Sequence, residues 1–166
     1  PLRVFGIFSG KGGVGKSCLA VNTALAMAQR GRRPLILDAD LGLANVEILF
    51  GIRPRLHIGD ALKGHSINDV ISDGPNGIGV LSGGAGLGEH QRLSDANKVR
   101  LVECFEYLER TYDVLIVDAG AGIGDTVQFF ITASHERILV LDPEPTALTD
   151  AYAAAKVIAQ AGVSRL

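Results

Sequence analysis

A glycine-rich loop near the N-terminus, SGKGGVGKSC at residues 9–18, constrains the fold of this chain more than any other segment. Four of its ten residues are glycine and two are lysine, so the loop itself favours neither a helix nor a strand. Apolar runs flank it, which predicts a buried strand before the loop and a helix after it. Strands and helices that alternate in this way form βαβ units around a parallel sheet.

The loop contains a phosphate-binding motif, because residues 10–17 match the P-loop pattern G-x-x-x-x-G-K-S/T. Glycines permit positive φ and leave the backbone amides open to a ligand, and the N-terminus of the next helix adds partial positive charge. We expect Lys16 to contact the β- and γ-phosphates of a nucleotide and Ser17 to ligate Mg²⁺. A glycine-rich turn without a ligand is the alternative, which the full pattern disfavours. The motif comprises Gly10, Lys11, Gly12, Gly13, Val14, Gly15, Lys16 and Ser17.

The rest of the chain alternates short apolar runs with helical patterns. The expected strands are 3–9, 34–40, 77–83, 113–120 and 137–143. The expected helices are 16–30, 94–110, 125–133 and 146–161, with short helices and turns within 53–76. The strands lack strict polar alternation, which is typical of parallel strands covered on both faces. This order predicts a single α/β P-loop domain over residues 1–166, with a mostly parallel, doubly wound sheet flanked by helices.

Three aspartates lie where predicted strands end. Asp38 and Asp40 end LILDAD, and Asp118 ends VLIVD. Ligands bind beyond the carboxyl ends of the strands in such sheets, so we expect all three side chains to face the P-loop. Carboxylates there can hold the water shell of a metal ion and orient a water that attacks phosphate. Taken singly, each could instead be an ordinary N-cap of a helix.

Composition narrows the class of protein. The chain is 47% hydrophobic with a formal net charge of -2, which suits a soluble domain and gives no basic footprint for nucleic acid. Cys18 and Cys104 lie far apart, and the sequence shows neither a signal-peptide pattern nor an apolar run of membrane-spanning length. We therefore expect a cytoplasmic protein. The last predicted helix leads into no further strand, so we expect a truncated domain that continues after residue 166.

The early lysine of KGGVGKS resembles the signature lysine of the deviant Walker A ATPases, the MinD/ParA family of SIMIBI-type P-loop NTPases. The segments DADLGLANVEILFGI, DAGAGIGDTV and PEPTALTDAYAAAKVI resemble most closely its FlhG/FleN (YlxH-like) branch, which regulates flagellar number and placement. The resemblance covers essentially the whole chain. It implies a slow, partner-stimulated ATPase that uses ATP and Mg²⁺, forms a homodimer with ATP, and acts as a switch in flagellar or cell-division positioning.

The resemblance also implies roles for charged residues. Lys11 would reach across the dimer to the phosphates of the partner subunit, while Lys16 serves its own subunit. Asp40 would orient the hydrolytic water in the first switch. Asp38 would lie near Mg²⁺, in contact through water, and Asp118 matches the Walker B-like aspartate.

Uncharged positions match the family as well. Asn45 matches an asparagine near the opposing nucleotide, and Gly120 to Gly122 match the second switch, with Gly122 near the γ-phosphate. Cys18 stands where many relatives have a hydroxyl that bonds the α-phosphate, so we expect only its backbone contact to remain.

The resemblance implies that the partner is a flagellar or division regulatory protein and that peripheral contact with the inner face of the membrane runs through a segment after residue 166. The adenine-contacting segments of relatives also lie there, so ATP rather than GTP is inferred from kinship. Two alternatives stay open. A ParA-like chromosome or plasmid partitioning ATPase would need a basic surface, against which 16 Lys+Arg beside 18 Asp+Glu counts. A metabolic or iron–sulfur assembly ATPase would need a substrate pocket or a C-x-x-C pair in the following part.

Overall fold

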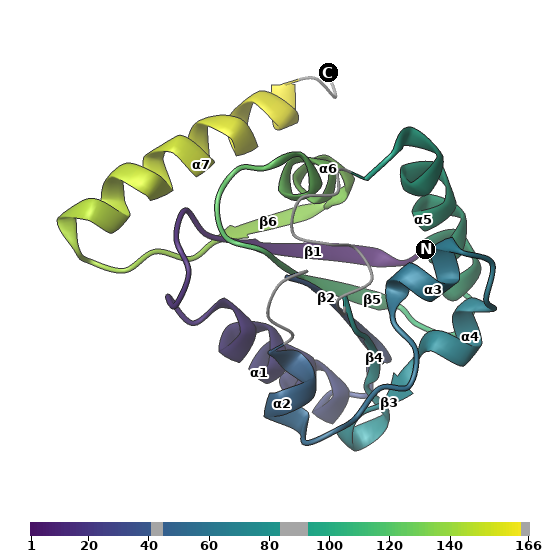
Figure 1. Cartoon of the computed structure of the whole chain (residues 1–166). Coiled ribbons are helices and arrows are strands. Elements are labelled where there is room, and N and C mark those ends of the chain that lie inside the picture. Colours follow the sequence, from purple (N-terminus) through teal and green to yellow (C-terminus); the bar gives the residue numbers. More distant parts are fainter. Residues whose placement is uncertain (41–44, 84–92, 164–166) are drawn as a thin grey trace.

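A six-stranded sheet forms the centre of this computed structural model, which describes residues 1–40, 45–83 and 93–163 (Figure 1). The strands are β1 (Arg3–Phe8), β2 (Pro34–Ala39), β3 (Ser72–Asp73), β4 (Gly79–Leu81), β5 (Val114–Ala119) and β6 (Glu136–Leu139). Their order is β3-β4-β2-β5-β1-β6, and every neighbouring pair is parallel except β3 with β4. The predicted mostly parallel α/β sheet is confirmed.

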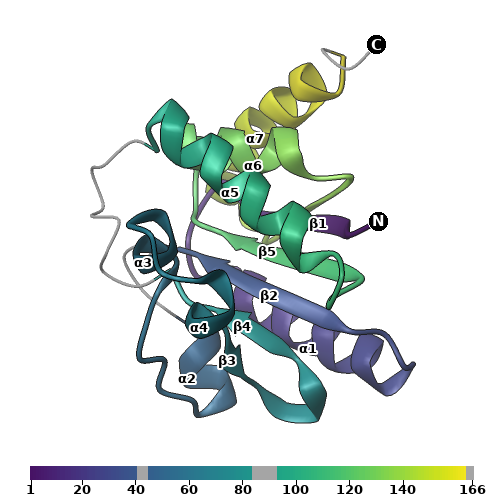
Figure 2. The ribbon, with the colours of Figure 1, turned by 90° about the vertical axis from the view of Figure 1, so that its right-hand side faces the viewer.

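Helices cover both faces of the sheet, as a doubly wound fold requires (Figures 1 and 2). On one face lie α1 (Lys16–Gln29) and α2 (Val46–Phe50). The other face carries α3 (Ile58–Leu62), α4 (Ile67–Val70), α5 (Asp95–Leu108), α6 (Asp125–Ala133) and α7 (Pro145–Val163). A short 3-10 helix, η1 (Pro75–Gly77), precedes β4. Among the described residues, no helix combines the length and apolar character that a bilayer span requires.

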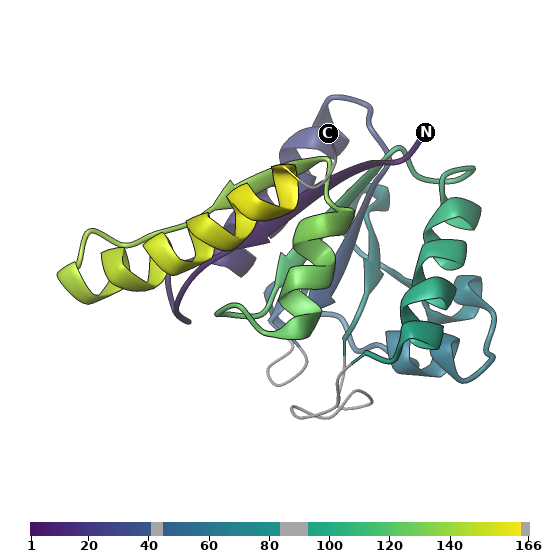
Figure 3. The ribbon, with the colours of Figure 1, turned by 90° about the horizontal axis from the view of Figure 1, so that it is seen from above.

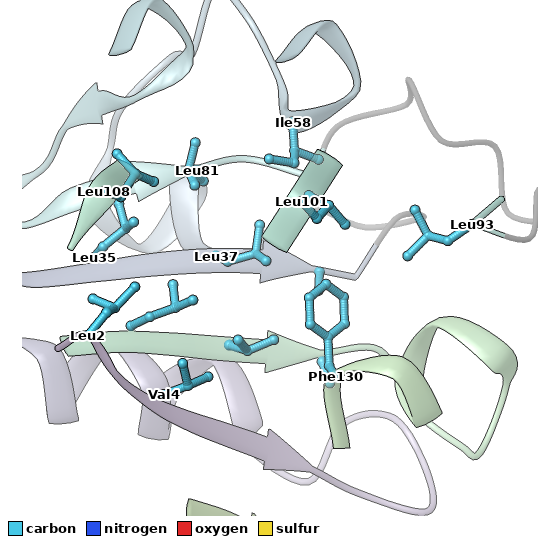
Figure 4. Packing of buried hydrophobic residues seen from close by; sticks show 14 of the residues in the cluster. Leu2, Val4, Leu35, Leu37, Ile58, Leu81, Leu93, Leu101, Leu108 and Phe130 are labelled. Carbon is cyan, nitrogen blue, oxygen red and sulfur yellow. The ribbon is translucent and has the colours of Figure 1, made fainter. Parts of the chain in front are cut away.

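The two central strands explain why the sequence lacks polar alternation. Every residue of β2 and β5 is buried, and successive side chains enter opposite layers of the core. Ile36 and Ile116 pack in the layer formed with α1. Leu35 and Leu37 pack in the opposite layer, where Leu101 of α5 meets them (Figure 4). Both faces of each strand are therefore apolar up to the point where the strand ends.

Two of the predicted helices, 16–30 and 94–110, are bounded by residues that favour helix ends. Gly15 precedes α1 with a φ of 96°, and Gly31 follows it with a φ of 77°. The Ser94 hydroxyl accepts a hydrogen bond of 3.1 Å from the amide of Asn97, which caps α5.

Some boundaries differ from the prediction. We expected a strand over 137–143, but β6 ends at Leu139, although the Val140 amide still donates to the Phe8 carbonyl over 2.8 Å. The strand ends there because its partner β1 ends at Phe8, the residue paired with Leu139. The antiparallel β3 and the five-residue α2 were not predicted, since segments so short show no hydrophobic period.

The central position of β5 makes a stability prediction. Ile116→Ala removes a fully buried side chain, so we expect the free energy of unfolding to fall by about 2–5 kcal/mol in urea denaturation. Ile48→Ala is the matched control, because Ile48 of α2 is 73% exposed and its loss leaves no cavity. Equal losses in the two variants would contradict the proposed core.

Candidate functional site

The P-loop joins the carboxyl end of β1 to the N-terminus of α1. It lies at the edge of the sheet where the parallel strands β2 and β5 also end (Figure 3). Gly13 and Gly15 adopt φ angles of 79° and 96°, which side chains with a Cβ rarely adopt. A Cβ added at Gly12, Gly13 or Gly15 would meet no atom within 4 Å. Gly13 and Gly15 are thus required by backbone conformation and not by packing, and the space that a side chain would occupy at all three glycines is open.

Lys16 is a buried cation at the first position of α1. The residue is only 7% exposed, which is unusual for a lysine without a counter-charge. It lies near the carboxylate of Asp118, whose pKa it lowers. A buried ammonium beside open backbone amides is suited to hold an anion with several charged oxygens, such as a triphosphate.

Asp38 and Asp118 lie side by side because the register of β2 with β5 pairs them directly. Asp38 is committed to the backbone. One of its oxygens accepts the Asp40 amide at 3.2 Å, and the other accepts the amides of Asn45 and Val46 at 2.8 and 3.0 Å. Burial raises the pKa of Asp38, and these three amides oppose that rise. Asp38 therefore anchors the start of α2 in addition to facing the site.

Asp118 differs from its neighbour, because neither of its buried oxygens has a hydrogen-bond partner among the described residues. Desolvation raises the pKa of Asp118 to about 6. The Ser17 hydroxyl lowers this pKa without completing a hydrogen bond of acceptable geometry, and the negative charge of Asp38 raises it further. Ionising this carboxylate in the absence of a ligand costs about 3 kcal/mol.

These groups fit a hydrated magnesium ion. The Ser17 hydroxyl and the unpaired Asp118 oxygens are hard oxygen donors, and Mg²⁺ is commonly held by one or two protein groups, waters and substrate phosphates. Within residues 1–40, 45–83 and 93–163, no group of three or more His, Cys, Asp or Glu side chains is arranged to bind a metal alone. The donor set thus suits an ion that arrives with a nucleotide.

The segment after β5 is tied to the P-loop through Ser9, which sequence analysis did not single out. The Gly122 amide donates to the Ser9 carbonyl over 2.9 Å, and the Ser9 hydroxyl donates to the Lys11 carbonyl over 2.6 Å. Ser9 is fully buried. The expected second switch, which contains Gly122, is therefore directly connected to the start of the phosphate-binding loop.

Lys11 forms an ion pair with a residue outside the predicted site. Its ammonium lies 2.7 Å from a carboxylate oxygen of Glu144, in the connection between β6 and α7. This pairing raises the pKa of Lys11 and lowers that of Glu144. Glu144 was not predicted, although the acidic turn LDPEP in the sequence was a usable signal.

The remaining predicted residues lie around the same edge. Asp40 is half-buried directly after β2, and Asn45 is the N-cap residue of α2. Cys18 is exposed in the first turn of α1, where its carbonyl accepts a 2.8 Å hydrogen bond from the Asn22 side chain. The structure thus brings Lys16, Ser17, Asp38, Asp40 and Asp118 together and leaves Lys11 on a separate side.

Comparisons with known proteins agree with this geometry. The ParA family, described as NUBPL iron-transfer P-loop NTPase, matches residues 2–166. Antiactivator FleN from Pseudomonas aeruginosa is 43% identical over 95% of this chain and 57% of its own length. Flagellum site-determining protein YlxH from Helicobacter pylori is 36% identical over 93% of this chain and 53% of its own length. The chain therefore spans about half the length of the curated relatives it matches.

Solved structures of the cell-division protein MinD share the fold. The cell division ATPase MinD from Pyrococcus furiosus has a TM-score of 0.79 and 32% identity, covering 96% of this chain and 68% of that one. MinD from Pyrococcus horikoshii, complexed with Mg-ADP, has a TM-score of 0.78 and 27% identity, covering 98% and 67%.

The unpaired Asp118 predicts a distinct pH dependence of stability. Its folded pKa of about 6 lies above the usual 3.8, so the folded state holds the proton more tightly than the unfolded state. Tighter proton binding to Asp118 in the folded state stabilises the fold below about pH 4, and this stabilisation is lost as pH rises through about 6. We expect Asp118→Asn to remove that loss, so its free energy of unfolding should exceed that of the wild type by up to about 3 kcal/mol at pH 7.

The measurement is urea denaturation of the nucleotide-free protein at several pH values between 4 and 7. Asp95→Asn is the control, because the Asp95 side chain is 98% exposed on α5. A stability difference between Asp118→Asn and wild type that stays constant over this range would contradict the assignment.

Proposed function

Because the chain belongs to the ParA family of P-loop NTPases, we propose that it is an ATP-driven molecular switch. It binds Mg²⁺·ATP, dimerises in that state and hydrolyses ATP slowly, and the cycle controls the number or placement of flagella. The unpaired carboxylate of Asp118 beside Lys16 and Ser17 carries the proposal, since this arrangement is complete only with a hydrated cation and a polyphosphate. The likeness to YlxH, a flagellum site-determining protein, supports the flagellar role.

Substrate is held by backbone and by two side chains. The open amides of the P-loop bind the phosphate oxygens, and the buried ammonium of Lys16 bridges the β- and γ-phosphates. The Ser17 hydroxyl would hold Mg²⁺, and Asp118 and Asp38 would accept hydrogen bonds from waters around the ion. When bound, the ion neutralises charge on the β- and γ-phosphate oxygens. With this ion in place Asp118 ionises without the cost described above.

Hydrolysis needs a positioned water and a second cation. Asp40 accepts a hydrogen bond from the water, whose oxygen forms a bond to the γ-phosphorus as the bond to the β-phosphate oxygen breaks. The products are ADP and inorganic phosphate. Lys11 of the opposing subunit stabilises the charge that builds up on the γ-oxygens, as an arginine finger does in other NTPases. Activity is low until the dimer and a partner protein complete the site.

The connections of the site suggest how the nucleotide state reaches the surface. Asp38 accepts hydrogen bonds from the amides of Asn45 and Val46 at the start of α2. The Gly122 amide donates a hydrogen bond to the carbonyl of Ser9, next to the P-loop. Contacts of the γ-phosphate and Mg²⁺ with these two segments order them, and hydrolysis releases them. The partner is a flagellar or division regulatory protein, and membrane contact is peripheral through a segment outside residues 1–166.

Variants of the full-length protein test the proposal. In Asp40→Ala, we expect Mg²⁺·ATP binding and dimerisation to persist while kcat for phosphate release falls by about 100-fold or more. In Lys11→Ala, we expect calorimetry to show ATP binding close to that of the wild type, but light scattering to show only monomers.

Lys98→Ala is the control, because this half-buried lysine of α5 pairs with Asp95 at 3.0 Å and is not one of the predicted site residues. Phosphate release by Asp40→Ala at the wild-type rate would overturn the hydrolytic role. Retention of DNA that depends on ATP and weakens with salt would favour the partitioning alternative instead.

A further inference from the structure

The cation that we expect to act on the partner subunit is engaged within its own chain. The Lys11 ammonium contacts the Glu144 carboxylate at 2.7 Å, across 133 residues of sequence. The P-loop and the connection from β6 to α7 lie on the same side of the molecule in two perpendicular views (Figures 1 and 3). This pair is therefore a tertiary contact and not a local turn.

Backbone packing holds the two halves of the contact in place. A Cβ added to Gly10 would lie 2.3 Å from the backbone carbon of Asp150 and 2.6 Å from its Cβ. The start of the P-loop thus touches α7, and only glycine fits between them. Lys11 follows Gly10 directly, and Glu144 directly precedes α7, so the close approach delivers both side chains to one place.

The surroundings of Lys11 are acidic. Besides Glu144, the carboxylates of Asp142 and Asp150 act on the Lys11 ammonium and raise its pKa. A triphosphate bound to a second subunit would approach this ammonium through three carboxylates. Like charges repel, so each carboxylate opposes the contact that the lysine must make.

We propose that Glu144 is a positioning residue that holds Lys11 in its own chain and thereby sets how readily the ATP-bound protein dimerises. The proposal rests on the function above, in which Lys11 acts across the dimer. To engage the partner's phosphates, each Lys11 must exchange a carboxylate for phosphate oxygens. Glu144 then resists premature association, and a bound partner protein that draws the connection away from the P-loop promotes dimerisation.

The size of the effect follows from exposure and symmetry. The side chains of Lys11 and Glu144 are 33% and 60% exposed, and ion pairs of this kind shift an equilibrium by up to about fivefold. A two-fold symmetric dimer opens two such pairs, so the factors multiply to as much as about 25-fold. Glu144 therefore tunes the dimerisation constant without blocking it.

The test uses the full-length protein carrying Asp40→Ala, so that ATP stays intact. Sedimentation at saturating Mg²⁺·ATP should give a dimer Kd for Glu144→Gln about 2- to 25-fold below that of the parent. Glu136→Gln is the matched control, because Glu136 pairs with Arg3 at an exposed site and should leave the Kd unchanged. A Kd for Glu144→Gln equal to or above that of the parent overturns the proposal.

A second measurement reports on Lys11 directly. In the nucleotide-free protein, NMR titration of lysine Cε should show a lower pKa for Lys11 in Glu144→Gln than in the wild type. An unchanged pKa would overturn the proposal that Glu144 holds Lys11. The two proposals can fail separately. If Lys11→Ala dimerises like the wild type, Lys11 has no role across the dimer, and the proposed role of Glu144 is then also wrong. If Lys11→Ala stays monomeric while Glu144→Gln leaves the dimer Kd unchanged, only the proposed role of Glu144 is wrong.

Discussion

The parallel pairing of β2 with β5 is the constraint on which the rest of the structure depends. Its register sets Asp38 opposite Asp118 at the carboxyl ends of two fully buried strands. Two neighbouring carboxylates in an apolar core are unfavourable unless something compensates them. Asp38 is compensated by the backbone amides at the start of α2, whereas Asp118 is left without a partner among the described residues. Ionised Asp118 therefore lowers the free energy of unfolding of the ligand-free protein, and its oxygens are not taken up by other described residues.

This difference between two identical side chains separates their tasks. Asp38 belongs to the framework, because three amides fix its orientation and connect it to α2. Asp118 belongs to the chemistry, because its protonation state depends on what binds beside Lys16 and Ser17. The two carboxylates therefore differ in what holds them, since amides that lead into α2 fix Asp38 and no hydrogen-bond donor among the described residues fixes Asp118.

Local sequence patterns were sufficient to predict most of the fold. The apolar runs before Asp38 and Asp118 are long enough to identify central strands, and the P-loop pattern identifies both a turn and its ligand. Two-residue β3 carries no such pattern. The pairing of Lys11 with Glu144 could not be predicted from local sequence either, since it depends on where α7 begins in space and the two residues are 133 positions apart. Likewise, nothing in LILDAD or VLIVDAG shows that Asp38 is held by amides while the oxygens of Asp118 lack a hydrogen-bond partner among the described residues, because the difference arises from how the chain turns after β2.

The absent side chain at Gly10 has a mechanical consequence. The backbones of Gly10 and Asp150 are in direct contact there, so the phosphate-binding loop packs against α7 with no space between them. α7 is the longest helix of the described chain, and it extends along the margin of the molecule (Figure 1). A change in the position of α7 would therefore have to move the start of the phosphate-binding loop as well, because no space separates Gly10 from Asp150.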